Sequence, residues 1–394
     1  MTVMPFTVHI PQETLDDLGD RLGRTRWPDE VEGAAWDYGT NLAYVQALVA
    51  YWRASFDWRA QEADLNRFTH FRTELDGLGI HFIHERGAGP HPLPLLLVHG
   101  WPSSFLQMRK ILPLLTDPAA YGGDAADAFD VVVPSLPGFG LSDRPTQRGM
   151  SVGRIAELFH ILMTRELGYA HFATRGGDLG AGVIGALALA YPEVVVGVHS
   201  GGTNPWIQQV PNDLSEAERT FVQNAQKWNQ QEMAYAQLHA TKPQTVAYGL
   251  NDSPAGLAAW IIEKFRRWSD CDGDVERRFT RDELLANLTI YWATQTINSS
   301  MRLYYETLRD PGGWGQPRVP TAALMSSKDM FPTPRAWAER TGKVDRWTEI
   351  DRGGHFLEWE EPELVAQDLR AFYRPLRAGP AGGTTTASPA TPRS

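Results

Sequence analysis

The fold of this chain is decided by the stretch Thr174-Arg175-Gly176-Gly177-Asp178-Leu179-Gly180-Ala181-Gly182. It follows a short strand pattern, His171-Phe172-Ala173, and leads into an apolar run at 183–190 that predicts a buried helix. A strand, a tight glycine turn, one reactive residue and a helix together make a nucleophile elbow. Such elbows usually present a serine, whereas this one presents Asp178. The alternative interpretation of Asp178 is a helix cap after a glycine loop.

Composition places the chain among soluble globular proteins. It has 394 residues, of which 42% are hydrophobic and 21% charged, enough for one large domain with additions or for two domains. The net charge of −10 and the absence of a basic stripe argue against a nucleic-acid partner. The single cysteine, Cys271, excludes an intrachain disulfide and favours a structural over a catalytic role for that thiol. Without a signal-peptide pattern or a run of about 18 apolar residues, we expect a cytoplasmic protein with no membrane anchor.

Short apolar strands alternate with helices through most of the chain. A hairpin is predicted across 71–85, with Asp76-Gly77 as its turn. Continuous apolar runs, which are typical of buried parallel strands, follow at 93–98 and 129–134. Further strands are predicted at 193–199, 321–325 and 344–347. This alternation predicts an α/β fold with a mostly parallel central sheet flanked by helices.

The pattern divides the chain into segments. Two helical patterns, near 12–22 and 42–55, indicate a helical N-terminal extension. Between 204 and 309 the strand pattern gives way to helices, which predicts a helical cap over the sheet edge where α/β proteins bind ligands. The expected segments are an extension at 1–70, a core at 71–203, a cap at 204–309, a second core part at 310–378 and a disordered tail at 379–394.

Two further polar residues, Asp329 and His355, follow predicted strands, and their order along the chain after Asp178 bears on function. Asp329 comes shortly after the strand that ends at Met325, and His355 lies in a glycine-flanked loop after the last strand. The order nucleophile, acid, histidine along the chain is that of the α/β-hydrolases. Individually, Asp329 fits a helix cap and His355 a plain loop residue. Their joint occurrence with Asp178, each after a strand, favours a catalytic set.

The sequence resembles the epoxide hydrolases of the α/β-hydrolase fold, in their microsomal and juvenile-hormone branch with its soluble relatives. The resemblance rests on motifs spread over nearly the whole chain: Pro5-Phe6, Leu22, Arg26-Trp27-Pro28, His99-Gly100-Trp101-Pro102, Gly177-Asp178-Leu179-Gly180, Thr241-Lys242-Pro243-Gln244-Thr245, Leu250-Asn251-Asp252-Ser253-Pro254 and Gly353-Gly354-His355-Phe356. Two departures stand out. Leu179 occupies a position where Trp or Ile is more usual, and the membrane anchor of the microsomal enzymes is absent.

The resemblance implies a set of five catalytic side chains: Asp178, Asp329, His355, Tyr235 and Tyr304. It also implies an oxyanion hole formed by the backbone N–H groups of Trp101 and Leu179. Tyr305 adjoins Tyr304, so the choice between these two tyrosines stays open. No metal or organic cofactor is expected.

These residue types suit the opening of an epoxide. A carboxylate is ionised at pH 7 and can attack a strained ring carbon, giving a covalent ester on Asp178. A phenol must protonate the oxygen that is expelled, and water activated by His355 would then hydrolyse the ester. The expected substrates are a small-molecule epoxide and water, and the product is a vicinal diol. The Ala-, Gly- and Arg-rich composition indicates a bacterium, where such chemistry serves detoxification or natural-product biosynthesis.

Three other functions are known for folds of this kind, and the residues of this chain fit each of them less well. A haloalkane dehalogenase also uses an aspartate nucleophile, but commonly has a tryptophan after it, where this chain has Leu179. A non-catalytic binding protein of the same fold would be expected to have lost a member of the triad, and all three are present. An esterase is excluded because the elbow carries no serine. A homodimer is common for this fold.

Overall fold

The computed structural model describes residues 2–202, 210–310, 315 and 317–377. Within these residues the chain forms one nine-stranded sheet, in the order β1-β2-β3-β5-β4-β6-β7-β8-β9. Its strands are β1 (Met4–Phe6), β2 (His70–Leu75), β3 (Leu78–Glu85), β4 (Leu93–Val98), β5 (Phe129–Pro134), β6 (Phe172–Gly177), β7 (Val195–Gly201), β8 (Thr321–Ser326) and β9 (Arg346–Ile350). The predicted tail and the first residues of the predicted cap, 204–209, lie outside the described residues.

The sheet is mostly parallel, as predicted. Strands β4 to β9 run parallel to one another. Strands β1, β2 and β3 form an antiparallel edge, and β3 joins the rest by antiparallel pairing with β5. In the centre, Leu95 of β4 pairs with Val131 on one side and Ala173 on the other. All six residues of β5 are buried. Strands covered on both faces need continuous apolar runs, which explains why the sequence pattern located them.

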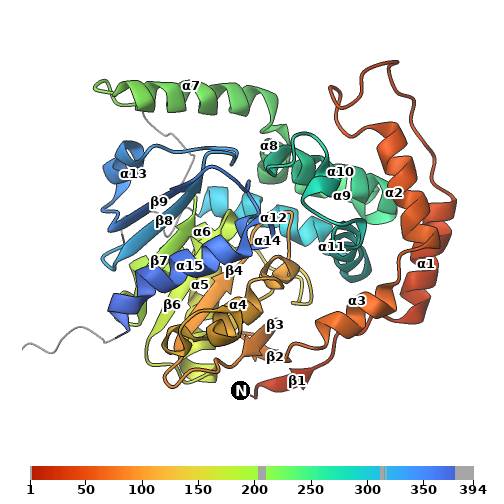
Figure 1. The fold of residues 1–394 in the computed structure, drawn as a ribbon. Coiled ribbons are helices and arrows are strands. Elements are labelled where there is room, and N and C mark those ends of the chain that lie inside the picture. Colours follow the sequence, from red (N-terminus) through yellow and green to blue (C-terminus); the bar gives the residue numbers. More distant parts are fainter. Residues whose placement is uncertain (1, 203–209, 311–314, 316, 378–394) are drawn as a thin grey trace, which may run out of the picture.

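Helices cover both faces of the sheet (Figure 1). On one face α5 (Val152–Ile161) packs against α6 (Leu179–Ala190), and α6 lies on β6 and β7. On the other face α4 (Leu112–Thr116) packs against α15 (Pro362–Tyr373), with α4 on β5 and α15 on β7 and β8. None of the described helices is long and apolar enough to cross a membrane.

A helical insertion separates β7 from β8, and we use this name for residues 216–309. Its helices are α7 (Glu216–Gln231), α8 (Ala234–Thr241), α9 (Pro243–Asp252), α10 (Pro254–Trp268), α11 (Arg281–Thr294) and α12 (Ile297–Arg309). Helices α9 and α10 begin at a proline. Proline suits the first turn of a helix, because the backbone N–H that it lacks would have no partner within the helix at that position. Figure 1 shows α7 extending away from the other insertion helices, which gather at one end of the sheet.

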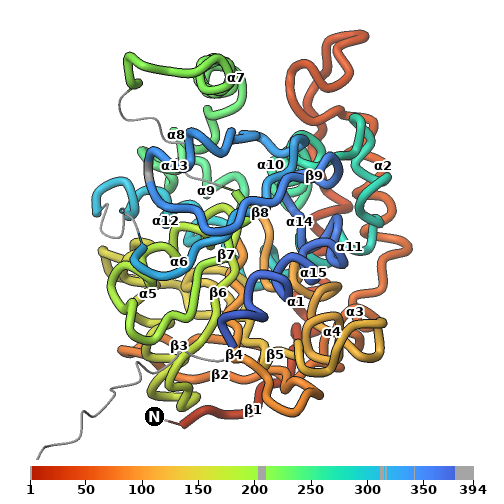
Figure 2. The backbone as a smooth tube through the Cα atoms, turned by 60° about the vertical axis from the view of Figure 1, so that its left-hand side comes forward, coloured from red at the N-terminus to blue at the C-terminus, as the bar shows by residue number. Residues whose placement is uncertain are grey.

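The N-terminal segment packs on the outside of the insertion (Figures 1 and 2). Its helices are α1 (Gln12–Gly23), α2 (Leu42–Ala54) and α3 (Trp58–Leu65). The buried indole N–H of Trp52 donates to Oγ1 of Thr289 in α11 at 3.1 Å, and the hydroxyl of Tyr51 donates to Asp282 at 2.9 Å. The extension is therefore one packing unit with the insertion. It also supplies strand β1, which the sequence pattern did not indicate.

Several element boundaries differ from those predicted. The hairpin is confirmed, with Asp76 and Gly77 at its turn. Strand β6 continues through the glycines to Gly177, and α6 begins at Leu179, well before the predicted 183. Strand β9 covers 346–350 and not 344–347. In each case the boundary is set by pairing with a neighbouring strand or by a strained turn. A local pattern of apolar residues indicates neither of these.

Candidate active site

Asp178 stands at a strained turn between β6 and α6. Its φ of 52° and ψ of −129° lie where residues with a side chain are rarely found, and such strain persists only where packing enforces it. The crossing is tight because a Cβ on Gly180 would lie 2.2 Å from the carbonyl oxygen of Val98 in β4. A Cβ on Gly100 would lie 2.4 Å from the Asp178 side chain. Glycine at both positions lets the carboxylate stand between the ends of two central strands.

The two oxygens of the Asp178 carboxylate have different neighbours. Oδ1 accepts the backbone N–H of Trp101 at 2.9 Å. Oδ2 lies 3.5 Å from Nε2 of His355. Leu179, the other predicted oxyanion residue, is the first residue of α6, and N–H groups in a first helical turn have no partner within the helix. One oxygen is thus held by a backbone donor while the other faces an imidazole.

His355 lies between two carboxylates. Its Nδ1 is 3.0 Å from Oδ1 of Asp329, in the loop after β8, and its side chain is 8% exposed. Asp178, Asp329 and His355 follow β6, β8 and β9, three parallel strands whose carboxyl ends share one edge of the sheet. The structure thus brings together three residues that follow separate strands in the sequence, with His355 between the carboxylates of Asp178 and Asp329.

The electrostatics of this row favour a charged imidazole. Burial alone would lower the pKa of His355, but the negative charge of Asp329 and the contacts with Asp178 raise this pKa to about 10. At neutral pH His355 is therefore an imidazolium as long as both carboxylates are charged. Any chemistry that neutralises one of the carboxylates removes part of what raises the pKa of His355.

Two tyrosines of the insertion belong to an aromatic cluster above Asp178. Tyr235, near the start of α8, stacks on Trp101 with ring centroids 5.1 Å apart, and Tyr304 of α12 packs edge-on against the same indole at 6.2 Å. Burial raises the pKa of both phenols above the usual tyrosine value, and the charge of Asp178 adds to both shifts. The Tyr304 hydroxyl is fully buried, and its contact with the hydroxyl of Tyr235 contributes to the raised pKa of Tyr304. Tyr305 packs elsewhere, with the Arg309 guanidinium 3.4 Å from its ring centroid.

Two members of this cluster, His239 and Trp268, were not predicted from the sequence. His239 lies one helical turn after Tyr235, with its ring 4.7 Å from Trp101, and its Nε2 accepts the indole N–H of Trp260 at 3.3 Å. Burial lowers the pKa of His239 to about 3, so this ring stays neutral. Trp268, at the end of α10, packs against His355 at 5.3 Å. His239 could have been predicted from its i, i+4 spacing after Tyr235, which puts both residues on one face of a helix. Nothing in the local sequence indicates that Trp268 belongs to the cluster.

A buried ion pair joins the elbow strand to the helix after His355. Arg175 of β6 is fully buried, and its Nε donates to Glu358 of α14 (Leu357–Glu360) at 2.8 Å. The amide of Gln107, which follows the Trp101 loop, donates to the other oxygen of Glu358 at 2.6 Å. The sequence could have indicated this ion pair, because Arg175 lies within an otherwise apolar strand pattern and a buried arginine requires a charged partner.

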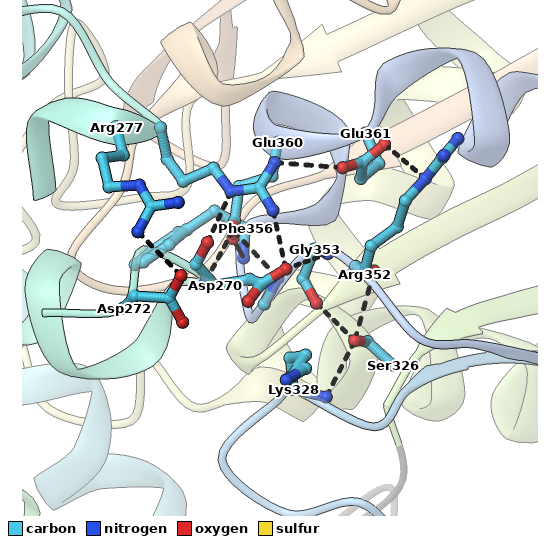
Figure 3. A network of polar contacts seen from close by, with 12 residues as sticks. Asp270, Asp272, Arg277, Ser326, Lys328, Arg352, Gly353, Phe356, Glu360 and Glu361 are labelled. Carbon is cyan, nitrogen blue, oxygen red and sulfur yellow. Dashed lines mark hydrogen bonds and ion pairs between the residues drawn. The ribbon is translucent and has the colours of Figure 1, made fainter. Parts of the chain in front are cut away.

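The acid and histidine loops are also tied to each other. Ser326, the last residue of β8, donates its hydroxyl to the carbonyl of Gly353 and accepts the N–H of Lys328 at 3.0 Å (Figure 3). Among the described residues, no group of three His, Cys, Asp or Glu side chains is arranged to hold a metal ion.

Comparisons with known proteins agree with this geometry. A family model described as alpha/beta hydrolase fold matches residues 94–362, and one described as epoxide hydrolase N terminus matches residues 3–108. The chain is 47% identical to a putative epoxide hydrolase of Stigmatella aurantiaca, over 95% of this chain and 86% of that protein. It is 36% identical to epoxide hydrolase 1 of Sus scrofa, over 94% of this chain and 88% of that protein.

Solved structures give the same result. The juvenile hormone epoxide hydrolase of the silkworm Bombyx mori superposes with a TM-score of 0.83 at 31% identity, covering 96% of this chain and 94% of that one. The epoxide hydrolase of Aspergillus niger has a TM-score of 0.83 at 29% identity, covering 95% and 97%. The fold is therefore that of the α/β-hydrolases. Within this class, the chain belongs to the epoxide hydrolase family.

Proposed function

We propose that this protein adds water to an epoxide, giving a vicinal diol, through a covalent ester on Asp178. The observation that carries the proposal is the position of the Asp178 carboxylate. One of its oxygens is held by the N–H of Trp101 at 2.9 Å, and the other faces His355 at 3.5 Å. Two insertion phenols, Tyr235 and Tyr304, lie near enough for the charge of Asp178 to raise their pKa values.

In the first step, Oδ2 of Asp178 attacks an epoxide carbon. The new C–O bond forms as the ring C–O bond breaks, and the ring oxygen takes a proton from Tyr235 or Tyr304. Burial disfavours a phenolate, so the donated proton must be replaced, and the imidazolium proton of His355 can replace it through solvent. The hydroxyls of Tyr235 and Tyr304 interact with each other, so the two phenols are placed to act on one ring oxygen.

In the second step, water hydrolyses the ester. Esterification removes the charge of Asp178 that helps to raise the pKa of His355, so the imidazole becomes neutral and accepts a proton from water. The hydroxide attacks Cγ of Asp178, and the oxyanion develops on Oδ1, where Trp101 already donates and Leu179 is placed to donate. The Cγ–O bond to the alkyl group then breaks, and the departing oxygen takes the proton from His355. Asp329 holds the ring and balances its charge.

We further propose that the helical insertion acts as a cap and that the enzyme works in a bacterial cytoplasm. The first proposal is supported by the contacts that Tyr235 and Tyr304 make with Trp101 of the core. The second is supported by the bacterial relative at 47% identity and by Cys271, which is buried as a free thiol, as expected in a reducing compartment.

The proposed function is tested by diol formation. Purified protein is incubated with a panel of small epoxides, styrene oxide among them, and diols are quantified by chromatography, with Asp178→Asn as the inactive control. We expect diol from at least one epoxide and none with the control. Halide release from chloro- and bromoalkanes is measured in parallel, because halide without diol would favour a dehalogenase instead.

A further inference from the structure

The backbone of the loop that carries His355 is held partly by the insertion. The N–H of His355 donates to the carbonyl oxygen of Trp268, the last residue of α10, at 2.8 Å. The N–H of Gly353 donates to Oδ2 of Asp270 at 3.1 Å. Loops normally satisfy their N–H groups by turns of their own or by water. This loop instead takes its shape from a helix end that lies more than eighty positions earlier in the sequence.

One carboxylate completes this attachment. Glu360 accepts the N–H of Asp270 at 2.9 Å, that of Gly354 at 2.9 Å and that of Phe356 at 3.1 Å. The last two residues flank His355 on either side. A single side chain thus joins the insertion to the loop both before and after the imidazole. Figure 3 shows Glu360 among its neighbours, with Asp270 and Phe356 labelled. Hydrogen bonds to a charged acceptor are stronger and more directional than neutral ones.

The contact between the helix end and the loop leaves no spare room. A Cβ on Gly354 would lie 2.4 Å from the carbonyl oxygen of Trp268 and 2.6 Å from Cα of Ser269. The Trp268 indole packs against the imidazole of His355, with ring centroids 5.3 Å apart, and against the ring of Tyr235 at 5.2 Å. The same helix end therefore contacts the proposed base and one of the proposed acids.

The neighbouring Glu361 has different partners. Its Oε1 accepts a hydrogen bond from Arg278 at 3.2 Å, and its Oε2 lies 3.1 Å from Nε of Arg352. Among the described residues, its carboxylate accepts no backbone N–H of the histidine loop. Figure 3 shows this ion pair at the rim of the network, with Arg352 beside Glu361. Glu361 is thus a matched comparison for Glu360: the same residue type, one position away, paired with two arginine side chains and not with the backbone N–H groups that flank His355.

We propose that Glu360 is a positioning residue for His355, which holds the base against the end of α10 and is needed for ester hydrolysis but not for ring opening. This inference rests on the proposed function, because it assumes that His355 is required in its position as a base only in the second step, whereas the proton lost in the first step can come through solvent. Glu360 touches no reacting atom, and its effect passes through the backbone on both sides of the imidazole.

Glu360→Gln is the informative substitution. Glutamine keeps the size of the side chain but replaces one carboxylate oxygen with an NH₂ group. Because NH₂ cannot accept a hydrogen bond, at least one backbone N–H that Glu360 accepts is left without an acceptor. A small displacement of the loop moves Nε2 away from the line between water and the ester. Proton transfer in the transition state is sensitive to such displacement. The attack by Asp178 needs no base and is unaffected.

The test separates the two steps by rapid quenching with styrene oxide. Intact-protein mass spectrometry gives the fraction of alkylated enzyme with time, and from it the rate constants of alkylation and hydrolysis. For Glu360→Gln we expect hydrolysis to slow about 10-fold or more, alkylation to change less than about 2-fold, and alkylated enzyme to accumulate. Glu361→Gln, the control, is expected to leave both rate constants within about 2-fold.

Several outcomes would overturn the inference. These are equal slowing of both steps, unchanged hydrolysis in Glu360→Gln, or the same loss in Glu361→Gln. If Glu360→Gln does not fold by circular dichroism, Asp270→Asn decides whether attachment of the loop to the end of α10 positions His355. It weakens the contact with the N–H of Gly353 and the ion pair with Arg278: slowed hydrolysis alone supports the inference, and unchanged hydrolysis overturns it. If the unsubstituted enzyme forms diol but His355→Gln gives no alkylated protein, the proposed two-step function fails instead.

Discussion

Nε2 of His355 lies 3.5 Å from Oδ2 of Asp178, so the proposed base of the second step is the charge partner of the proposed nucleophile of the first. Together with Asp329, this contact raises the pKa of His355 to about 10 despite burial. Alkylation of Asp178 removes one of the two negative charges. In the proposed mechanism, the first step would thereby lower the pKa of the base that the second step needs.

Asp178→Asn is expected to lower the pKa of His355. The amide keeps the shape of the site but removes the negative charge beside Nε2, while Asp329 still favours the charged ring. An NMR titration of protein with ¹⁵N-labelled histidine measures this pKa, and Asp20→Asn, an exposed change on α1, is the control. An unchanged pKa in Asp178→Asn would contradict the charge coupling. Turnover is also expected to be lost, because an amide is not a nucleophile for an epoxide.

His355→Gln is expected to trap the ester. Alkylation needs no base, so one equivalent of styrene oxide should add to each chain and remain bound. Peptide mapping should place the added mass on the peptide that contains Asp178. The control is Asp178→Asn, which should take up no mass. Uptake on any other residue, or none at all with an epoxide that the unsubstituted enzyme accepts, would contradict the covalent mechanism.

Tyr235→Phe and Tyr304→Phe are each expected to slow alkylation, by about 10²-fold, which is typical for loss of a positioned acid. The two phenols lie near Asp178, whereas Tyr305 packs under Arg309. Tyr305→Phe is therefore the matched control and is expected to leave alkylation unchanged. Single-turnover rates with styrene oxide measure the effect. A larger loss in Tyr305→Phe than in Tyr304→Phe would shift the role of second acid to Tyr305.

Fully buried histidines, His99, His199 and His239 among them, predict a loss of stability in acid. Burial lowers the pKa of His99 and of His199 to about 4, and that of His239 to about 3. Below about pH 6.5 the unfolded chain binds protons that the folded one does not, so the free energy of unfolding falls by up to about 1.4 kcal/mol per pH unit for each histidine.

Urea unfolding between pH 7 and pH 5 measures this slope. His239→Gln should make the slope shallower by about one histidine's contribution. His9→Gln is the control at an exposed position, since the His9 side chain is 67% exposed, and should leave the slope unchanged. A slope that is insensitive to both changes would mean that other groups control unfolding in acid.

Arg175→Met is expected to destabilise the protein by about 3–5 kcal/mol, because it leaves the buried carboxylate of Glu358 without its charge partner. Arg24→Met removes an ion pair on α1 whose arginine side chain is 80% exposed, and should cost less than about 1 kcal/mol. Urea unfolding at neutral pH compares the two variants. Equal effects would show that the Arg175–Glu358 pair contributes no more than a surface pair.

The sequence by itself determined the core strands, the elbow and the order of the three polar residues. These features are local: buried parallel strands need continuous apolar runs, and a strained turn at Asp178 needs glycines beside it. Each of Asp178, Asp329 and His355 follows a strand, and parallel strands bring such positions to one edge of a sheet. The proximity of the three could therefore be inferred without coordinates, while the distances among them could not.

Only the tertiary structure decided how the insertion meets that edge. That Tyr304 and not Tyr305 approaches Asp178 depends on the rotation of α12, which a one-residue step along the helix changes by about 100°. The roles of Trp268 and Glu360 depend on hydrogen bonds between segments more than eighty positions apart, and no local periodicity records such pairs. Strand β1 likewise forms because β2 offers it an edge, since three residues carry too weak a pattern to indicate a strand alone.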